Sequence, residues 1–193
     1  MNTVTPKFMA RSFNFIPQSS SLKQRPSLEV YRENAVKAEE LGYDGFTYYD
    51  HNAFFRNHEN IESFWRELLH YDALIMTKDI FELWTTLTYL ATVTSRIKVV
   101  ANVVCINFRA PSIVAHAGAT LDVICNGRLE LGLGTGGDAE EALAFGLPNP
   151  GKPSVRAEKL REYVQIIKMM WTEDAPSFEG KYYRIKGAVC NPK

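Results

Sequence analysis

Two patterns of hydrophobic and polar positions alternate along this chain, and their order predicts a repeated strand and helix unit. Short apolar runs suited to strands occupy residues 13–16 (FNFI), 45–49 (GFTYY), 97–104 (IKVVANVV) and 128–134 (RLELGLG). Apolar residues recur at helical spacing in residues 28–41, 79–94, 110–125 and 155–171, and residues 138–146 suit a shorter helix. Because each strand run is followed by a helix, we expect a parallel sheet with right-handed crossovers.

Glycine and proline support these boundaries. Gly42 stands where the first helix would end, and Pro111 stands near the start of the third. The segment between His51 and Asp79 is long for a connection, and such long connections are usually functional. Four strand and helix units would complete a doubly wound sheet, or form half of a (β/α)₈ barrel of about 250 residues. Periodicity alone leaves both architectures open.

Composition narrows the classes of function. The chain has 193 residues, 46% of them hydrophobic and 12% aromatic, which is enough for one globular domain. Its 22 basic and 22 acidic residues give no net charge, so we do not expect the chain to bind a nucleic acid or an anionic membrane. The expected partner is a small-molecule substrate. No apolar run approaches the roughly 18 residues of a membrane span, and residues 1–13 lack the layout of a signal peptide. We therefore expect a cytoplasmic protein.

Cysteine spacing predicts neither disulfides nor a metal site. Cys105, Cys125 and Cys190 form no C-x-x-C pair and are odd in number. We interpret them as reduced thiols.

One glycine-rich stretch suggests a nucleotide site. Gly132, Gly134 and Gly137 fit the G-x-G-x-x-G spacing of a dinucleotide-binding loop. That loop normally belongs to the first strand and helix unit, with an acidic residue ending the next strand. Here it follows the fourth strand, and the acidic residue at the right distance, Glu158, falls within a helix. Two interpretations remain: the glycines let a flat cofactor approach the backbone, or they only reverse the chain.

Several blocks in order carry a family resemblance. They are AEELGYDGFTYYDH, ELWTTLTYLATVTSRIKV, RAPSIVAHAGATLDVICNGRLELGLGTGGDAEEALAFGLP and WTEDAPSFEGKYYRIKGAVCNPK. The chain resembles the luciferase-like flavin-dependent oxidoreductases, which include bacterial luciferase and the coenzyme F420-dependent barrel enzymes, from about Phe13 to Lys193. The resemblance implies a TIM (β/α)₈ barrel, of which residues 1–193 supply about the first half, strands 1 to 4 with their helices, as a single domain truncated before strand 5.

The resemblance also implies site residues at the strand ends, the face where barrel active sites lie. Asp50 and His51 end the second strand, so His51 is a candidate general acid or base and Asp50 is expected to orient it or to contact the cofactor. At Asn102-Val103 many relatives carry a bulge with a non-prolyl cis peptide behind the flavin ring; an ordinary trans peptide is the alternative.

A glycine loop completes the implied site. Gly134, Thr135 and Gly136 match the family loop that approaches the isoalloxazine. F420-dependent sugar-phosphate and alcohol dehydrogenases tend to have glutamate directly after this Gly-Thr-Gly, where this chain has Gly137. This difference favours FMN over coenzyme F420 as the cofactor, with NAD(P)H at most a transient reductant.

The function that the resemblance favours is a monooxygenase that uses reduced FMN and O₂. The alternative is a coenzyme F420-dependent oxidoreductase that transfers hydride. From another class, a half barrel could bind flavin or a partner subunit without catalysis. Since half a barrel leaves strand edges unpaired, we expect a homodimer or association with another half-barrel chain.

Other polar residues carry weaker hypotheses. His58 and His70 could line a substrate pocket or lie on an exposed excursion. His116 is expected to be structural, and Arg109 is expected to form a surface salt bridge rather than a phosphate contact.

Overall fold

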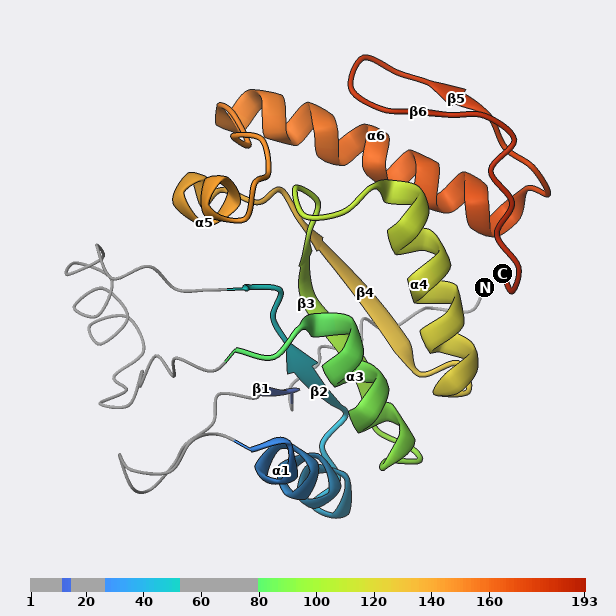
Figure 1. Cartoon of the computed structure of the whole chain (residues 1–193). Helices are drawn as coiled ribbons and strands as arrows, with labels where there is room; N and C mark the ends of the chain where they lie inside the picture. The colour runs from blue at the N-terminus through green and yellow to red at the C-terminus, as the bar shows by residue number, and fades with distance from the viewer. Residues whose placement is uncertain (1–11, 15–26, 53–79) are drawn as a thin grey trace, which may run out of the picture.

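The computed structural model describes residues 12–14, 27–52 and 80–193 (Figure 1). Its elements are β1 (Ser12–Asn14), α1 (Leu28–Glu40), β2 (Gly45–Tyr48), α3 (Leu83–Thr92), β3 (Lys98–Cys105), α4 (Pro111–Ile124), β4 (Leu129–Gly134), α5 (Ala139–Ala144), α6 (Pro153–Thr172), β5 (Phe178–Glu179) and β6 (Arg184–Ile185). Each predicted strand and helix is present, with boundaries that differ by a few residues. The predicted ends at Ile16 and Asp79 lie outside the described residues.

The sheet has four parallel strands in the order β1-β2-β3-β4. Gly45 of β2 is level with Ser12 of β1 and with Lys98 of β3, and Leu129 of β4 is level with Val99. The predicted parallel sheet is confirmed. A doubly wound sheet would place the first strand inside the sheet, so the sequential order excludes that architecture.

The hydrophobic core lies between this sheet and its helices. Figure 1 shows α1, α3 and α4 side by side against the sheet, and α4 also packs against α6. Phe46 and Tyr48 of β2 and Val99 and Ala101 of β3 are at most 1% exposed, and the ring of Tyr48 meets Tyr31 of α1 edge-on. Alternate strand residues therefore fill the core, and the strand ends remain available for a site.

Arg128, at the start of β4, holds the amino end of the sheet together. Its buried guanidinium donates to the carbonyls of Cys125, Ile97 and Ala91 at 2.7 to 2.8 Å. One side chain thus satisfies carbonyls at the ends of α3 and α4 and at the start of β3. Such carbonyls would otherwise be costly to bury.

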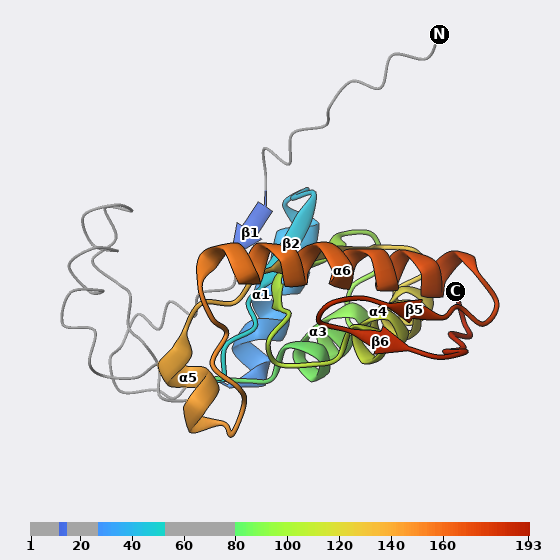
Figure 2. The ribbon, with the colours of Figure 1, turned by 90° about the horizontal axis from the view of Figure 1, so that it is seen from above.

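The C-terminal hairpin β5–β6 was not predicted from the sequence. Figures 1 and 2 show it beside α6, far from β1. The carboxylate of Glu162 on α6 accepts hydrogen bonds from the backbone amides of Lys181, Tyr182 and Tyr183 at 2.8 to 3.1 Å. One side chain of α6 therefore anchors the hairpin. Strands of two residues need such a contact, because an isolated short hairpin is only marginally stable.

Candidate functional site

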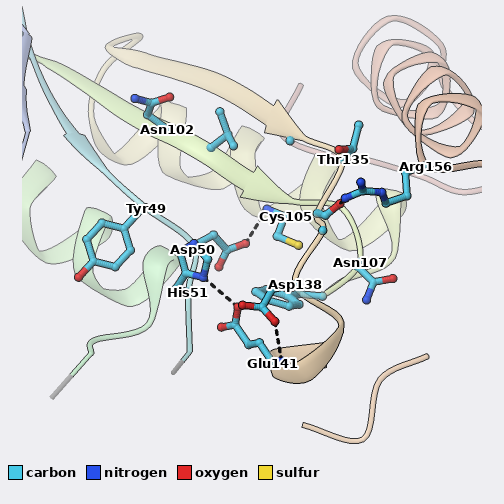
Figure 3. A pocket seen from close by; sticks show the side chains of 15 residues that line it. Tyr49, Asp50, His51, Asn102, Cys105, Asn107, Thr135, Asp138, Glu141 and Arg156 are labelled. Atoms are coloured by element: carbon cyan, nitrogen blue, oxygen red, sulfur yellow. Dashed lines mark hydrogen bonds and ion pairs between the residues drawn. The ribbon is translucent and has the colours of Figure 1, made fainter. Parts of the chain in front are cut away.

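A cavity of about 430 Å³ opens at the carboxyl ends of the parallel strands (Figure 3). It is lined by Tyr49, Asp50, His51, Asn102, Val103, Cys105, Asn107, Phe108, Gly134, Thr135, Gly136, Gly137, Asp138, Glu141 and Arg156. All seven site residues predicted from the sequence are in this set. The lining comes from the ends of β2, β3 and β4, from α5 and from the first turn of α6.

Asp50 is held inside the protein by two donors. Its side chain is 1% exposed and accepts from the Cys105 amide at 2.9 Å and from Arg109 Nη1 at 2.6 Å. Burial raises the pKa of Asp50 above its ordinary value, although Arg109 and the amide pull it down. Asp50 therefore joins β2 to the end of β3 and does not carry a free charge into the cavity.

The expected salt bridge at Arg109 is present, but its expected place at the surface is wrong. The Arg109 side chain is 18% exposed and bridges two carboxylates, Asp50 and, through Nη2 at 2.7 Å, Glu82 at the start of α3. The planar guanidinium reaches both partners because its donors form a fork. Sequence reasoning missed this network, since the three residues are far apart in the chain.

His51 contacts a carboxylate at the cavity wall. Nδ1 of His51 lies 2.8 Å from Oε2 of Glu141, and the backbone N–H of Asn52 donates to Oε1 of the same carboxylate at 2.5 Å. Figure 3 shows Glu141 reaching from α5 toward His51. Burial by itself lowers the pKa of His51, but the hydrogen bond and charge of Glu141 outweigh it, so that the pKa is raised above its ordinary value.

Glu141 was not predicted as a site residue. Its side chain is 1% exposed, although it belongs to a six-residue helix. The only signal in the sequence was an acidic residue in the first turn of a short helix directly after β4. Since barrel sites lie at the strand ends, that position could have been included.

The predicted irregularity at the end of β3 is confirmed. The Asn102–Val103 peptide bond is cis, and the register of β3 against β4 shifts between Ala101 and Val104. Both residues border the cavity, and Val103 is 40% exposed. The bulge turns an apolar side chain toward the cavity in a strand that is otherwise largely buried.

The glycine spacing is explained by contacts within the protein. A Cβ at Gly132 would lie 2.7 Å from the Ala101 carbonyl, and one at Gly134 would collide with Val103. Gly136 has φ +63°, and its Cβ would lie 2.7 Å from Cys105 Sγ. Gly132, Gly134 and Gly136 therefore let β4 and its loop pack against β3, which explains two of the three glycines in the matched spacing; at the third, Gly137, a Cβ would meet only the guanidinium of Arg156.

Glu158, which the dinucleotide interpretation would require at a strand end, lies on α6. Its carboxylate binds Lys181 and Tyr182 of the C-terminal segment, away from the cavity. Together with the packing of the glycines, this placement leaves no support for a dinucleotide-binding loop.

A family model described as luciferase-like monooxygenase matches residues 9–193. The chain belongs to this family. An F420-dependent glucose-6-phosphate dehydrogenase of Amycolatopsis mediterranei is 32% identical over 157 residues, which cover 81% of this chain and 41% of that protein. The pyrimidine monooxygenase RutA of Acinetobacter baylyi is 30% identical over 169 residues, which cover 87% of this chain and 42% of that protein.

Solved structures show the same luciferase-like α/β fold. An F420-dependent secondary alcohol dehydrogenase in complex with an F420-acetone adduct superimposes with a TM-score of 0.70 at 22% identity, over 94% of this chain and 48% of that one. The FMN-bound oxygenating constituent of 3,6-diketocamphane monooxygenase from Pseudomonas putida gives a TM-score of 0.66 at 20% identity, over 92% of this chain and 43% of that one. The chain thus spans less than half the length of the relatives named here.

The other candidate residues are the three remaining histidines and the three cysteines. His116 is exposed on α4 and does not line the cavity, while His58 and His70 fall outside the described residues. Cys105, Cys125 and Cys190 are free thiols, and burial raises the pKa of Cys105 to about 11. In residues 27–52 and 80–193 no cluster of three or more acidic, histidine or cysteine side chains could hold a metal ion.

None of the helices in the described part of the chain has the length and apolar character needed to cross a bilayer.

Proposed function

We propose that this chain forms the first half of a (β/α)₈ barrel, as one domain over residues 1–193, and belongs to a flavin-dependent monooxygenase that uses reduced FMN and O₂. The observation that carries the proposal is the cavity at the carboxyl ends of β2, β3 and β4, where the predicted site residues meet. Barrel enzymes place their chemistry on this face. Membership of the luciferase-like family supports the same conclusion.

The cavity residues fit the flat ring of a flavin or deazaflavin. A volume of about 430 Å³ suits a small-molecule site. Val103 supplies an apolar surface, and the backbone of residues 134–137 borders the cavity without large side chains. His51, Asn107 and Arg156 supply polar groups around this surface. When bound, such a cofactor supplies hydride transfer or O₂ activation.

The protein's own contribution is orientation and proton exchange. His51 is 40% exposed at the cavity wall and has a pKa raised above its ordinary value, so it can give or take a proton near neutral pH. Asp50 fixes the end of β2 through Cys105 and Arg109. A small-molecule substrate would meet the cofactor beside His51.

Coenzyme F420 is the second candidate cofactor. Gly137 lacks the carboxylate that F420-dependent dehydrogenases tend to carry after Gly-Thr-Gly, but the structure brings the carboxylate of Glu141 to the same cavity. An acidic group beside His51 is therefore present, supplied from α5 four residues further along the chain. This observation supports a hydride-transferring enzyme as the alternative reaction class.

Ligand titration of the full-length protein tests the proposal. We expect FMN or F420 to bind and to change its absorbance, near about 450 or 420 nm respectively, whereas NAD⁺ should show no tight binding. His51→Ala should lower turnover with the bound cofactor by about 10²-fold while leaving the unfolding midpoint nearly unchanged. Absence of binding by both cofactors would contradict the proposal, and binding without any turnover would favour a non-catalytic half barrel.

A further inference from the structure

Glu141 is a buried carboxylate whose two oxygens have different donors from the end of β2. Oε1 accepts a hydrogen bond from the backbone N–H of Asn52 at 2.5 Å, and Oε2 lies 2.8 Å from Nδ1 of His51. The side chain of Glu141 is 1% exposed. A carboxylate so removed from water is costly unless it is hydrogen-bonded, so these contacts offset the cost of its burial.

The backbone of Glu141 is fixed independently of His51. Asp138 caps α5 by accepting from the Glu141 amide at 2.9 Å, and the next residue, Ala142, is fully buried. Figure 3 shows Asp138 and Glu141 on the same side of the cavity, across from the end of β2. The backbone that carries the carboxylate is therefore held by contacts that do not involve the imidazole.

The contact limits which nitrogen of His51 can carry a proton. A carboxylate in its ionised form only accepts hydrogen bonds, so with Glu141 ionised the donor is Nδ1 of His51 and the acceptor is Oε2. In the neutral imidazole the proton then resides on Nδ1, and Nε2 is the nitrogen that can exchange a proton. The ring orientation is fixed by the same contact.

Other charges act on His51 in the same direction. Asp138 and Asp50 raise its pKa along with Glu141, while burial lowers it. Of the remaining titratable groups that line the cavity, Tyr49 has its ring centroid 6.0 Å from the imidazole, and Cys105 and Arg156 lie on neighbouring elements. The Asp50 charge is shared with Arg109 at 2.6 Å, and among the described residues Glu141 is the carboxylate in direct contact with His51.

We propose that Glu141 is a positioning residue for His51, and that it fixes the Nδ1–H tautomer and directs proton exchange to Nε2. The inference rests on the proposed function in one respect, namely that His51 is the group that exchanges a proton during the reaction. A purely structural role, docking α5 to β2 through the Asn52 amide, is the competing explanation.

Glu141→Gln separates the two roles. Glutamine keeps the volume and one acceptor oxygen for the Asn52 amide but removes the charge beside His51. Glu140→Gln is the matched control, because Glu140 is the exposed neighbour on the same helix and does not line the cavity. Both variants should fold, and a structural role alone predicts the same histidine titration in each.

The measurement is a ¹⁵N and ¹³C NMR titration of the histidine rings without any added ligand. The chain has four histidines, and the His51 signals are those lost in His51→Gln. We expect the Nδ1–H tautomer in the wild type and in Glu140→Gln. In Glu141→Gln the pKa of His51 should fall by about one unit and the tautomer preference should weaken. An Nε2–H tautomer in the wild-type protein, or an unchanged His51 titration in folded Glu141→Gln, would overturn the proposal.

Kinetics extend the test to the loaded enzyme. The limb of the pH–rate profile that belongs to His51 should move to lower pH in Glu141→Gln, with turnover reduced at least about tenfold at neutral pH. If neither FMN nor F420 binds but the His51 titration changes as expected, the proposed function fails and the positioning role stands. If turnover is present but His51 titrates identically in all three proteins, the positioning role fails alone.

Discussion

At the residue scale, the glycines of strand β4 both pack against β3 and border the cavity. The glycines of Gly132-Leu133-Gly134 allow β4 to approach the bulge of β3, and the Gly134 backbone then borders the cavity. Val103 is the side chain that a Cβ at Gly134 would strike. Because valine is β-branched and has few rotamers, it cannot easily move aside.

Gly134→Ala should therefore destabilise the protein by about 1 to 3 kcal/mol, the usual cost of overpacking. In a Val103→Ala background the same substitution should cost clearly less, because the colliding methyl group is gone. Chemical denaturation of the four proteins in a double-mutant cycle measures this coupling. Equal costs in both backgrounds would show that Val103 does not impose the glycine.

The candidate site shows how far single residues can be predicted. Asp50 and His51 are adjacent in sequence and directly follow a strand run, so their place at the strand end was predictable. The contact between His51 and Glu141 joins residues 90 positions apart, and Arg109 reaches Asp50 across 59 positions. No periodic pattern encodes such distances, because they depend on how the strands lie side by side.

At the element scale, one carboxylate fastens α1 to the start of β3. Glu39 accepts from the Ser95 amide at 2.8 Å and from the Arg96 amide at 3.2 Å. Burial raises the pKa of Glu39, but these backbone donors lower it more, so that the pKa lies below its ordinary value. A lowered carboxyl pKa gives stability above the unfolded pKa that is lost as pH falls through the folded value.

Glu39→Gln should thus lower the free energy of unfolding by about 1 kcal/mol at pH 7, and the difference should shrink below about pH 4.5. The control is Glu40→Gln on the same helix, whose ion pair with Lys37 is exposed and should contribute less than about 0.5 kcal/mol. Urea unfolding between pH 3 and 7 measures both. A pH-independent loss in Glu39→Gln would argue against the charged hydrogen bonds.

Elements also differ in how strongly the sequence indicates them. The long helix α6 and the apolar strand β3 have repeated patterns over many residues, so their type was predictable. The strands β5 and β6 have two residues each and depend on Glu162 of α6 for backbone partners. A pattern so short carries no periodic signal.

At the scale of the whole molecule, the sheet is unevenly covered. All four residues of β2 are buried, whereas all six residues of β4 are only half-buried. Within the described part of the chain, β4 pairs with β3 alone. A strand with an unpaired edge can recruit another strand.

We therefore expect the 193-residue chain to associate in solution. Light scattering after gel filtration should give a mass at least twice that of one chain at micromolar concentration. A monomeric wild-type chain would contradict the proposed homodimer or half-barrel association.

The sequence by itself determined the alternation of strands and helices, because hydrophobic periodicity reports which face each element buries. It also located His51 and the Asn102–Val103 bulge through the family resemblance, and both predictions of position agree with the structure. Periodicity left the strand order open and the resemblance implied the sequential order of a barrel; the tertiary structure shows that order, with β1 at the edge of the described sheet, and excludes the doubly wound one. It likewise decided that the glycines of β4 serve close packing, and that Glu141 faces His51, because side-chain contacts depend on which distant segments become neighbours.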